Sequence, residues 1–504
     1  MTGLFHALRS KARSQGHIAT IDAAKAAPPP SPLAPIDLTD SAQVAGVMDI
    51  SARIGELLLA SGTSNNDAKT QIHAVCSAYG LHYVHVDITF NTITIFTHIG
   101  THRRQPVTVF RVVRGLTTDF SKLSEVDRLI RSIQGGATPP EVAEKILDEL
   151  YAKPATYKQS TSILGWGVMG GTVSVMLGGD AIVGLTSFFV SMLIMAVNYW
   201  LDKKNLPYFF QNVVGGMLAT LPAAVMYASV AYFGVRISPS QIIASGIIVL
   251  LAGLTLVQSL QDGITGAPVT ASARFFETLL YTGGIVGGVG LGIQLSATLG
   301  MALPALESVA PPNFQSALVR VVFGAIATGG FALACYAEKS SVWLSAITAA
   351  SGSVFYYYVL SPLGTSGVTA AAVAAVVIGL AGGLLARRFQ IPPVITAIAG
   401  ITPLLPGLSV YRGMYAALHE QMLVGFTNLA VALATACALA AGVVLGEFIA
   451  RRLRRPPKIN AYRAFRAARR YSFQQASRAK RAQARLTGSR RRPKRGASGA
   501  SGVE

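Results

Sequence analysis

Charged residues are scarce in this chain of 504 residues, since Asp, Glu, Lys and Arg make up only 13% of it. Soluble domains carry roughly 25%. Apolar residues reach 51%. Apolar stretches of about 20 residues recur from Ile163 to Phe448, each long enough to cross a bilayer. This composition excludes an ordinary soluble protein and predicts a polytopic α-helical membrane protein.

Cysteine is nearly absent as well. Cys76, Cys335 and Cys437 lie in unrelated contexts, which excludes a disulfide framework and a cysteine-based zinc site. We expect neither a metal nor a cofactor. The N-terminal residues are basic and polar, then Pro-rich, without the apolar core of a signal peptide.

Acidic residues are few, and the basic excess is local. The net charge is +20, but eighteen of the 43 Lys and Arg residues lie from Arg451 onward, against the single acid Glu504. We expect residues 450–504 to be a disordered cytoplasmic tail near anionic lipids. Nucleic-acid binding is the alternative, although the tail has no recognisable RNA-binding signature and no specific nucleic acid is expected.

The chain before the apolar stretches divides into two parts. Residues 1–40 are rich in Ala, Pro and Ser without periodicity, which predicts a disordered segment. Residues 41–152 predict a cytoplasmic α+β domain. Its expected helices and strands are, in chain order, helix 44–60, a helix ending at Tyr79, strands 84–89, 92–97 and 107–113, and helices 121–133 and 139–151.

Ten membrane spans are predicted in the remainder. They are, approximately, 162–178, 181–200, 209–233, 241–260, 276–297, 317–336, 341–360, 367–386, 393–409 and 421–449. Loops at one side carry Lys203/Lys204, Arg274, Lys339, Arg387/Arg388 and the tail, whereas the other side has little beyond Arg236 and Arg412. The positive-inside rule then places both termini in the cytoplasm, consistent with an even number of spans.

Two stretches far apart in the chain resemble each other. Ala252–Gly266 (AGLTLVQSLQDGITG) and Ala399–Gly413 (AGITPLLPGLSVYRG) both open with Ala-Gly-(Leu/Ile)-Thr and close on Gly. They lie on the fourth and ninth predicted spans, so they run in opposite directions. Residues 162–298 and 317–449 are therefore predicted to be two five-helix repeats of inverted topology, as in many secondary transporters.

The chain resembles the threonine/serine exporter (ThrE) family, most closely its single-chain actinobacterial members. The motifs that carry the resemblance are QDGITGAPVTASARFFE at 261–277, FQNVVGG at 210–216, LPGLSVYRG at 405–413, SGTSNND at 61–67 and HVDITFNTIT at 85–94. The resemblance implies export of L-threonine and L-serine across the cell membrane, driven by the proton motive force. It implies threonine, serine and protons as partners and leaves assembly into a homo-oligomer open.

Two alternatives to amino-acid export remain at this stage. One is an exporter of small dicarboxylates such as succinate. The other is a membrane-anchored hydrolase or regulatory protein that uses Asp67, Asp87 or His85 of the N-terminal part. His82, His85 and Asp87 hint at metal ligands, but positions three apart on a strand point to opposite faces.

Ionisable residues at membrane depth are costly, so each one is a candidate for function. Asp262 lies where the fourth span is expected to break, at Asp262-Gly263. As a carboxylate it can receive a substrate ammonium group or a proton, and the alternative is a capping residue in a loop. Arg274 can bind a substrate carboxylate with Glu277 as its partner or proton site, and a plain ion pair is the alternative.

The ninth span and its surroundings supply further candidates. Pro403 and Pro406 interrupt the helix, so backbone groups near Gly407 are free to bind a zwitterion. Arg412 is one of the few basic residues on the predicted outer side of the membrane. We expect it either to bind the carboxylate of a departing substrate or to anchor the protein at the outer surface. The pair His419-Glu420 is a candidate for proton coupling, with a simple loop as the alternative.

The remaining candidates have strong structural alternatives. Pro268 matches the prolines of the second half, and Asn212 can hydrogen-bond a hydroxylated side chain or serve in helix packing. Glu447 and Arg451, four apart, predict a helix ion pair. The glycines of Gly283–Gly292 predict close helix packing and not a nucleotide loop, because they lie in an apolar span without a lysine.

Overall fold

The computed structural model describes residues 40–99, 105–113, 115, 119–136, 138–231, 238–250, 252–301, 303, 314–418 and 420–453. The predicted disordered segment before Asp40 and the basic tail beyond Leu453 therefore lie outside the described residues. The described residues all belong to one compact unit.

The N-terminal module, by which we mean the described residues of 40–152, has the elements that the sequence predicts, in the predicted order. They are α3 (Ser41–Ala60), α4 (Asn65–Ala78), β1 (His85–Thr89), β2 (Thr92–Ile99), β3 (Gln105–Val112), α5 (Phe120–Gln134) and α6 (Pro140–Ala152). Three of the helices begin at a side chain that accepts backbone N–H groups, namely Asp40, Ser64 and Asp119.

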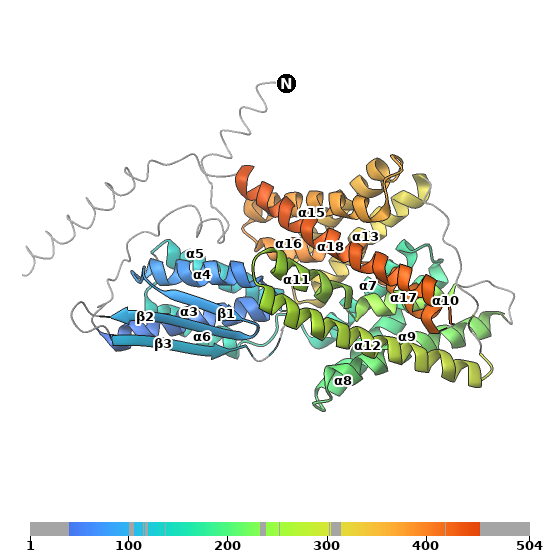
Figure 1. The fold of residues 1–504 in the computed structure, drawn as a ribbon, viewed down its shortest axis with the longest axis horizontal. Helices are drawn as coiled ribbons and strands as arrows, with labels where there is room; N and C mark the ends of the chain where they lie inside the picture. Colours follow the sequence, from blue (N-terminus) through green and yellow to red (C-terminus); the bar gives the residue numbers. More distant parts are fainter. Residues whose placement is uncertain are drawn as a thin grey trace, which may run out of the picture. The chain divides into compact units, whose positions relative to one another are not determined.

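The sheet of the module is antiparallel, in the order β1-β2-β3. Alternate residues of β1 and β2, including Val86, Ile93 and Ile95, are fully buried, whereas every second residue of β3 is exposed. The helices thus cover one face of the sheet (Figure 1). This period of two is the pattern from which the strands were predicted.

The rest of the described chain is helical. It comprises α7 (Gln159–Met176), α8 (Ala181–Asp202), α9 (Tyr208–Ala231), α10 (Pro239–Val249), α11 (Ala252–Ile264), α12 (Pro268–Thr298), α13 (Phe314–Ala334), α14 (Lys339–Val354), the π-helix η1 (Phe355–Leu360), α15 (Gly367–Phe389), α16 (Pro393–Gly400), the 3₁₀ helix η2 (Thr402–Leu404), α17 (Gly407–Leu418) and α18 (Met422–Leu453).

Several of these helices are suited to crossing a membrane. Six described helices are long and apolar enough, namely α8, α9, α12, α13, α15 and α18, and two bent helix pairs raise the number to eight. The protein is therefore a polytopic helical membrane protein. The remaining two predicted spans coincide with α7 and with α14 plus η1, which do not meet the same criteria of length and hydropathy.

The fourth predicted span is broken, but not at the predicted residues. The chain bends by 47° between Val249 and Leu254, whereas α11 continues through Asp262 to Ile264. The expectation of a break at Asp262-Gly263 is wrong, because Gly263 lies in the last turn of the helix. The chain reverses only at Gly266, whose φ of 97° suits glycine, and Pro268 then starts α12 as its first residue.

The ninth predicted span is broken where its prolines predict. Pro393–Leu404 and Gly407–Ala417 meet at 46°, with Pro406 between them. Pro406 lacks the N–H that a continuous helix needs. In the alignment of Ala252 with Ala399, the first bend lies at the start of the repeated motif and the second lies further along it, so the two breaks are not at aligned positions.

Two pairs of longer helices are in extensive contact, α9 with α12 and α15 with α18. Glycines line both crossings: a Cβ on Gly216 would lie 2.6 Å from the Ile285 carbonyl oxygen, and one on Gly379 would lie 2.5 Å from that of Val443. A Cβ on Gly288 would overlap the Val213 carbonyl. Gly284, Gly288 and Gly292 thus serve helix packing, whereas a Cβ on Gly283 or Gly287 would meet nothing within 4 Å.

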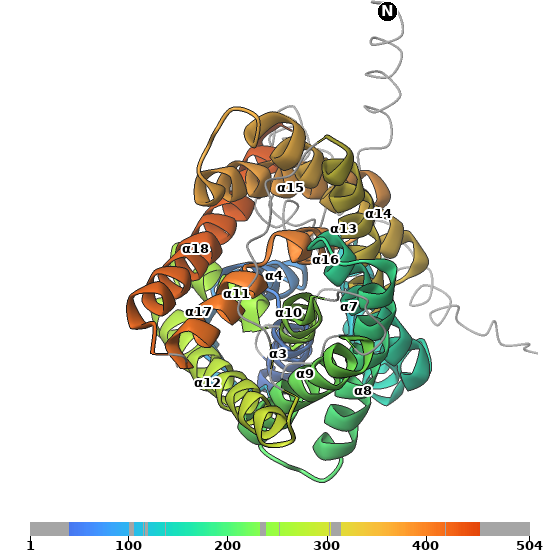
Figure 2. The same cartoon turned by 90° about the vertical axis from the view of Figure 1, so that its right-hand side faces the viewer.

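The short pieces α10, α11, α16 and α17 lie between these pairs, as Figure 2 shows. Most residues of α10 and α16 are buried. The two broken segments also meet each other, because Gly407 at the start of α17 lies against the side chain of Ile248 in α10.

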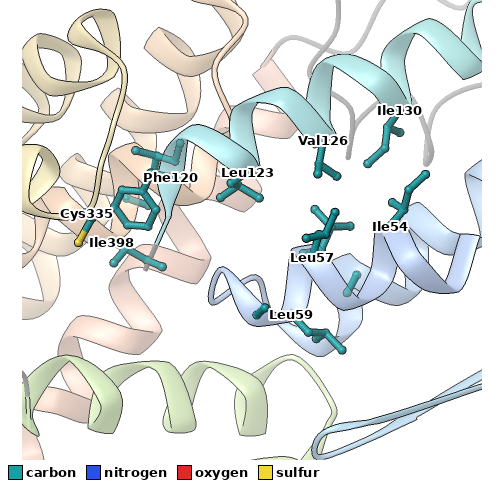
Figure 3. Packing of buried hydrophobic residues seen from close by; sticks show 14 of the residues in the cluster. Ile54, Leu57, Leu59, Phe120, Leu123, Val126, Ile130, Cys335 and Ile398 are labelled. Carbon is teal, nitrogen blue, oxygen red and sulfur yellow. The ribbon is translucent and has the colours of Figure 1, made fainter. Parts of the chain in front are cut away.

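The N-terminal module shares a continuous apolar core with these helices. Phe120 at the start of α5 lies beside Cys335 and Ile398 (Figure 3), and its N–H donates to the Cys335 carbonyl at 2.9 Å. Polar contacts surround this core. Arg128 pairs with Glu338 at 2.5 Å, and Arg131 donates to the Gln390 carbonyl at 2.6 Å.

The module thereby contacts the chain reversals after α13 and after α15, so both reversals lie at one end of the bundle. Burial lowers the pKa of Arg131 to about 10, which leaves its guanidinium cationic at neutral pH.

Candidate functional site

A buried ion pair joins the ends of α11 and α12. Arg274 Nη1 lies 2.6 Å from Asp262 Oδ2, and the two residues are 9% and 1% exposed. The reversal at Gly266 makes the helices neighbours, which brings the side chains together across twelve residues of sequence. Arg274 therefore pairs with Asp262 and not with Glu277, the partner predicted from their spacing on one helix face.

The turn between α3 and α4 of the N-terminal module covers this ion pair. The backbone N–H of Asn65 donates to Asp262 Oδ1 at 3.1 Å. Asn65 is the first residue of α4, so the carboxylate of Asp262 lies at a helix N-terminus, where the dipole favours negative charge. The guanidinium and the helix end each favour the anionic form of Asp262, whereas its burial opposes that form.

A second set of hydrogen bonds fixes the turn on α12. The Asn65 side-chain amide donates to Thr270 Oγ1 at 2.6 Å, and the Phe90 N–H donates to the same oxygen at 2.9 Å. Asn65 and Thr270 are both buried. The module is therefore attached to the membrane helices at the ion pair itself.

A pocket opens beside the ion pair. It is lined by residues of the α3–α4 turn, α11, α12, α16 and α18, namely Gly62, Ser64, Asp67, Leu254, Val257, Gln258, Gln261, Asp262, Arg274, Val394, Ala397, Ile398, Ile401, Val443 and Glu447. Its empty space measures about 460 Å³, including space open to solvent.

The lining has two chemical characters. One part consists of three carboxylates (Asp67, Asp262 and Glu447) and one guanidinium (Arg274), with glutamine amides beside them. Apolar side chains of α11, α16 and α18 form the rest of the wall. Such a lining suits a small ligand that carries an ammonium group, a carboxylate and a short side chain.

Two of the pocket's acids were not predicted as residues of a transport site, although Asp67 was a candidate for the hydrolase alternative. Glu447 is within ion-pair distance of Arg451, at 3.7 Å, as its spacing predicts, but it also lines the pocket. A carboxylate inside the long apolar run of α18 was the available signal. Asp67 reaches the pocket only because its module packs on α11, a contact between segments far apart in the sequence.

Four predicted site residues in the first half and the ninth span lie elsewhere. Glu277 is half-buried on α12, and Pro268 is exposed at the N-terminus of that helix. Asn212 of α9 lies against Gly284 of α12, a packing contact. Pro403 packs against Gly324 of α13. None of the four lines the pocket at Asp262.

The remaining predicted residues belong to the second broken segment and its end. Pro406 and Gly407 are buried where α17 meets α10, and Arg412 is half-buried on α17. Glu420 is exposed, with a φ of 63°, and His419 lies outside the described residues. Pro406, Gly407, Arg412 and Glu420 do not line the pocket at Asp262.

The residues that the hydrolase alternative requires do not form a cluster in the module. His82, His85 and Asp87 are exposed at the sheet, whereas Asp67 faces the pocket. Within the part of the chain that the structure describes, no group of three His, Cys, Asp or Glu residues is placed to hold a metal ion.

Comparison with known proteins finds two family models that match in succession. Residues 49–296 match the family described as "Putative threonine/serine exporter", and residues 320–449 match the one described as "Threonine/Serine exporter, ThrE". The first match covers most of the module and the helices through most of α12, and the second runs from within α13 to within α18.

Two curated proteins are similar over most of their length. The threonine/serine exporter of Corynebacterium glutamicum is 66% identical over 466 residues, which cover 92% of this chain and 95% of that protein. The probable threonine/serine exporter of Mycobacterium tuberculosis is 36% identical over 417 residues, or 81% of this chain and 77% of that protein. No solved structure matches the chain.

Proposed function

Because this chain belongs to the threonine/serine exporter family, we propose that it is a secondary transporter that exports L-threonine and L-serine from the cytoplasm, driven by the proton motive force. Membership of an exporter family implies a transporter and not an enzyme. The helical spans make the protein a multi-pass membrane protein.

The observation that carries the mechanism is the buried pair of Asp262 and Arg274 at the pocket. A zwitterionic amino acid can insert between them, with its carboxylate on Arg274 and its ammonium group on Asp262. Two intermolecular ion pairs then replace one internal pair, so the charges stay compensated as the substrate enters.

Proton coupling follows from competition at Asp262. The carboxylate receives either the ammonium group or a proton, and the two cannot occupy it together. Protonation from the outer side releases the substrate, and loss of the proton to the cytoplasm prepares Asp262 for the next one. Exchange of a proton for a substrate in this way uses the proton motive force for export.

The charge of the pocket bears on which ligand is carried. A dicarboxylate such as succinate brings two negative charges to a lining with three carboxylates and one guanidinium. Like charges placed next to each other in a binding site cost several kcal/mol. The pocket therefore favours an amino acid over the dicarboxylate alternative.

Alternating access in this proposal uses two inverted repeats of five helices each. Three observations support the repeats. The two family models match the halves separately, the third and fifth helices pack together in each half, and the fourth is broken in each. Ten spans result when α7 and α14 with η1 also cross the membrane.

We place the module, both termini and the basic tail in the cytoplasm, with the tail near anionic lipid, from the distribution of Lys and Arg. In that orientation the α3–α4 turn closes the pocket from the cytoplasm. Asn65 must therefore move away from Asp262 and Thr270 for the substrate to enter.

Efflux from loaded cells tests the function. Cells are loaded with threonine through a threonine-containing dipeptide, and external threonine is then measured over time. We expect a gene deletion to slow efflux severalfold, and a protonophore to slow it in the wild type only. Equal efflux from both strains would refute threonine export, and a deletion phenotype that is insensitive to the protonophore would refute proton coupling alone.

A further inference from the structure

Two glutamine side chains of the pocket, Gln258 and Gln261, have no hydrogen-bond partner within the described protein. Gln258 of α11 makes no hydrogen bond to another described residue, although it lines the pocket and is half-buried. Ser64, in contrast, is engaged as the N-cap of α4, where it accepts from the Asp67 N–H. The Gln258 amide is thus available as both donor and acceptor.

The position of Gln258 relative to the ion pair is defined by the helix. Gln258 and Asp262 are four residues apart on α11, so their side chains lie on one face about 5–6 Å apart. The amide lies close to the α3–α4 turn, because a Cβ on Gly62 would lie 3.1 Å from Gln258 Nε2. The amide is therefore beside the turn and on the α11 face that carries Asp262.

This spacing fits a particular arrangement of groups. In serine and threonine the ammonium nitrogen and the hydroxyl oxygen are on adjacent carbons, about as close as two hydrogen-bonded atoms. A hydrogen bond from each to a protein group, at about 2.9 Å, spans two side chains one helical turn apart. We infer, on the basis of the proposed function, that Gln258 binds the substrate hydroxyl while Asp262 binds the adjacent ammonium group.

The apolar part of the lining bears on the acceptance of both substrates. Val394 and Ile398 of α16 are apolar residues that line the same pocket. They provide a surface for the methyl group by which threonine differs from serine. A single methyl group in an apolar site changes affinity by about tenfold or somewhat more, so both amino acids bind.

The test compares threonine with L-2-aminobutyrate, which has the same carbon chain without the hydroxyl. The full chain is reconstituted in proteoliposomes with a pH gradient, and each compound competes with labelled threonine. We expect the wild type to prefer threonine by about tenfold, the effect of one hydrogen bond to a buried group. The Gln258→Leu variant should bind threonine as weakly as 2-aminobutyrate, whose own affinity changes less than about threefold.

Matched variants separate this role from a general disturbance. Gln294→Leu removes an exposed glutamine on α12 and should keep the preference for threonine. Equal weakening of both compounds in Gln258→Leu, an unchanged preference, or loss of the preference in Gln261→Leu in place of Gln258→Leu would each overturn the assignment of Gln258. Absence of threonine transport by the wild type would instead refute the proposed function.

Discussion

Asp262 and Arg274 form a buried ion pair at the pocket. Both are buried, and each provides the counter-charge that makes burial of the other tolerable. Removal of one partner of such a pair costs about 3–5 kcal/mol, because a buried charge is left uncompensated. Loss of both partners together leaves a neutral and less costly contact.

This reciprocity yields a prediction for the pair. Asp262→Asn should abolish proton-coupled threonine efflux, because an amide can take up neither a proton nor an ammonium group as an ion pair. The single variants Asp262→Asn and Arg274→Gln should both melt at lower temperature in detergent than the double variant. Efflux from vesicles and thermal melting of the purified chain provide the two measurements.

Asp202→Asn is the matched control, since Asp202 is exposed at the end of α8. It should leave both efflux and melting unchanged. Coupled efflux by Asp262→Asn at the wild-type rate would remove Asp262 from the mechanism, whatever its effect on stability.

Helix type and order in this chain follow from local signals. Apolar runs of span length, N-caps such as Ser64, and the alternation of β1 to β3 predicted nearly every element within a few residues. The start of α12 was misplaced by eight residues, because Pro268 begins the helix before the apolar run does. The bend near Leu250 was missed, since no proline marks it.

The site was less predictable than the elements. The rule that buried charges carry function singled out Asp262 and Arg274 separately, yet their pairing depends on the reversal at Gly266. Asp67 and Asn65 reach the site through the packing of the module on α11 and α12. Local sequence periodicity carries no information about contacts between segments far apart in the chain. The positions of these two residues at the site could therefore not be predicted from sequence patterns.

The close crossing of α9 and α12 lets us predict how glycine substitutions on α12 change the stability of the protein. Gly288→Ala should destabilise the protein by about 1–3 kcal/mol, the usual cost of overpacking, because the new Cβ overlaps the Val213 carbonyl. A Cβ on the neighbouring Gly287 would meet no other atom within 4 Å, so Gly287→Ala should melt like the wild type. Equal melting of the two variants would contradict the close crossing.

The whole molecule has one end at which the module contacts the membrane helices. The chain reversals after α13, after α15 and between α11 and α12 all lie at that end, because each contacts the module. With the module in the cytoplasm, the opposite ends face outward, including the reversal between η1 and α15.

Thiol labelling of intact cells tests this orientation. In a Cys437→Ala background the remaining cysteines, Cys76 and Cys335, are buried. Leu363→Cys, at an exposed position after η1, should react with a membrane-impermeant reagent from outside. Lys203→Cys, between α8 and α9, should react only after permeabilisation. The reverse pattern would invert the proposed topology.

The glycine-lined crossings have a mechanical consequence. Backbones in van der Waals contact along α9–α12 and α15–α18 cannot slide past one another without losing that contact over many residues. Each pair is therefore expected to move as one rigid body. The short helices α10, α11, α16 and α17 lie between the two pairs, and their bends of 46° and 47° are places where the helix axes can change direction. We expect the movement that opens the pocket to the other side of the membrane to occur in these four short helices, while the two helix pairs stay in place.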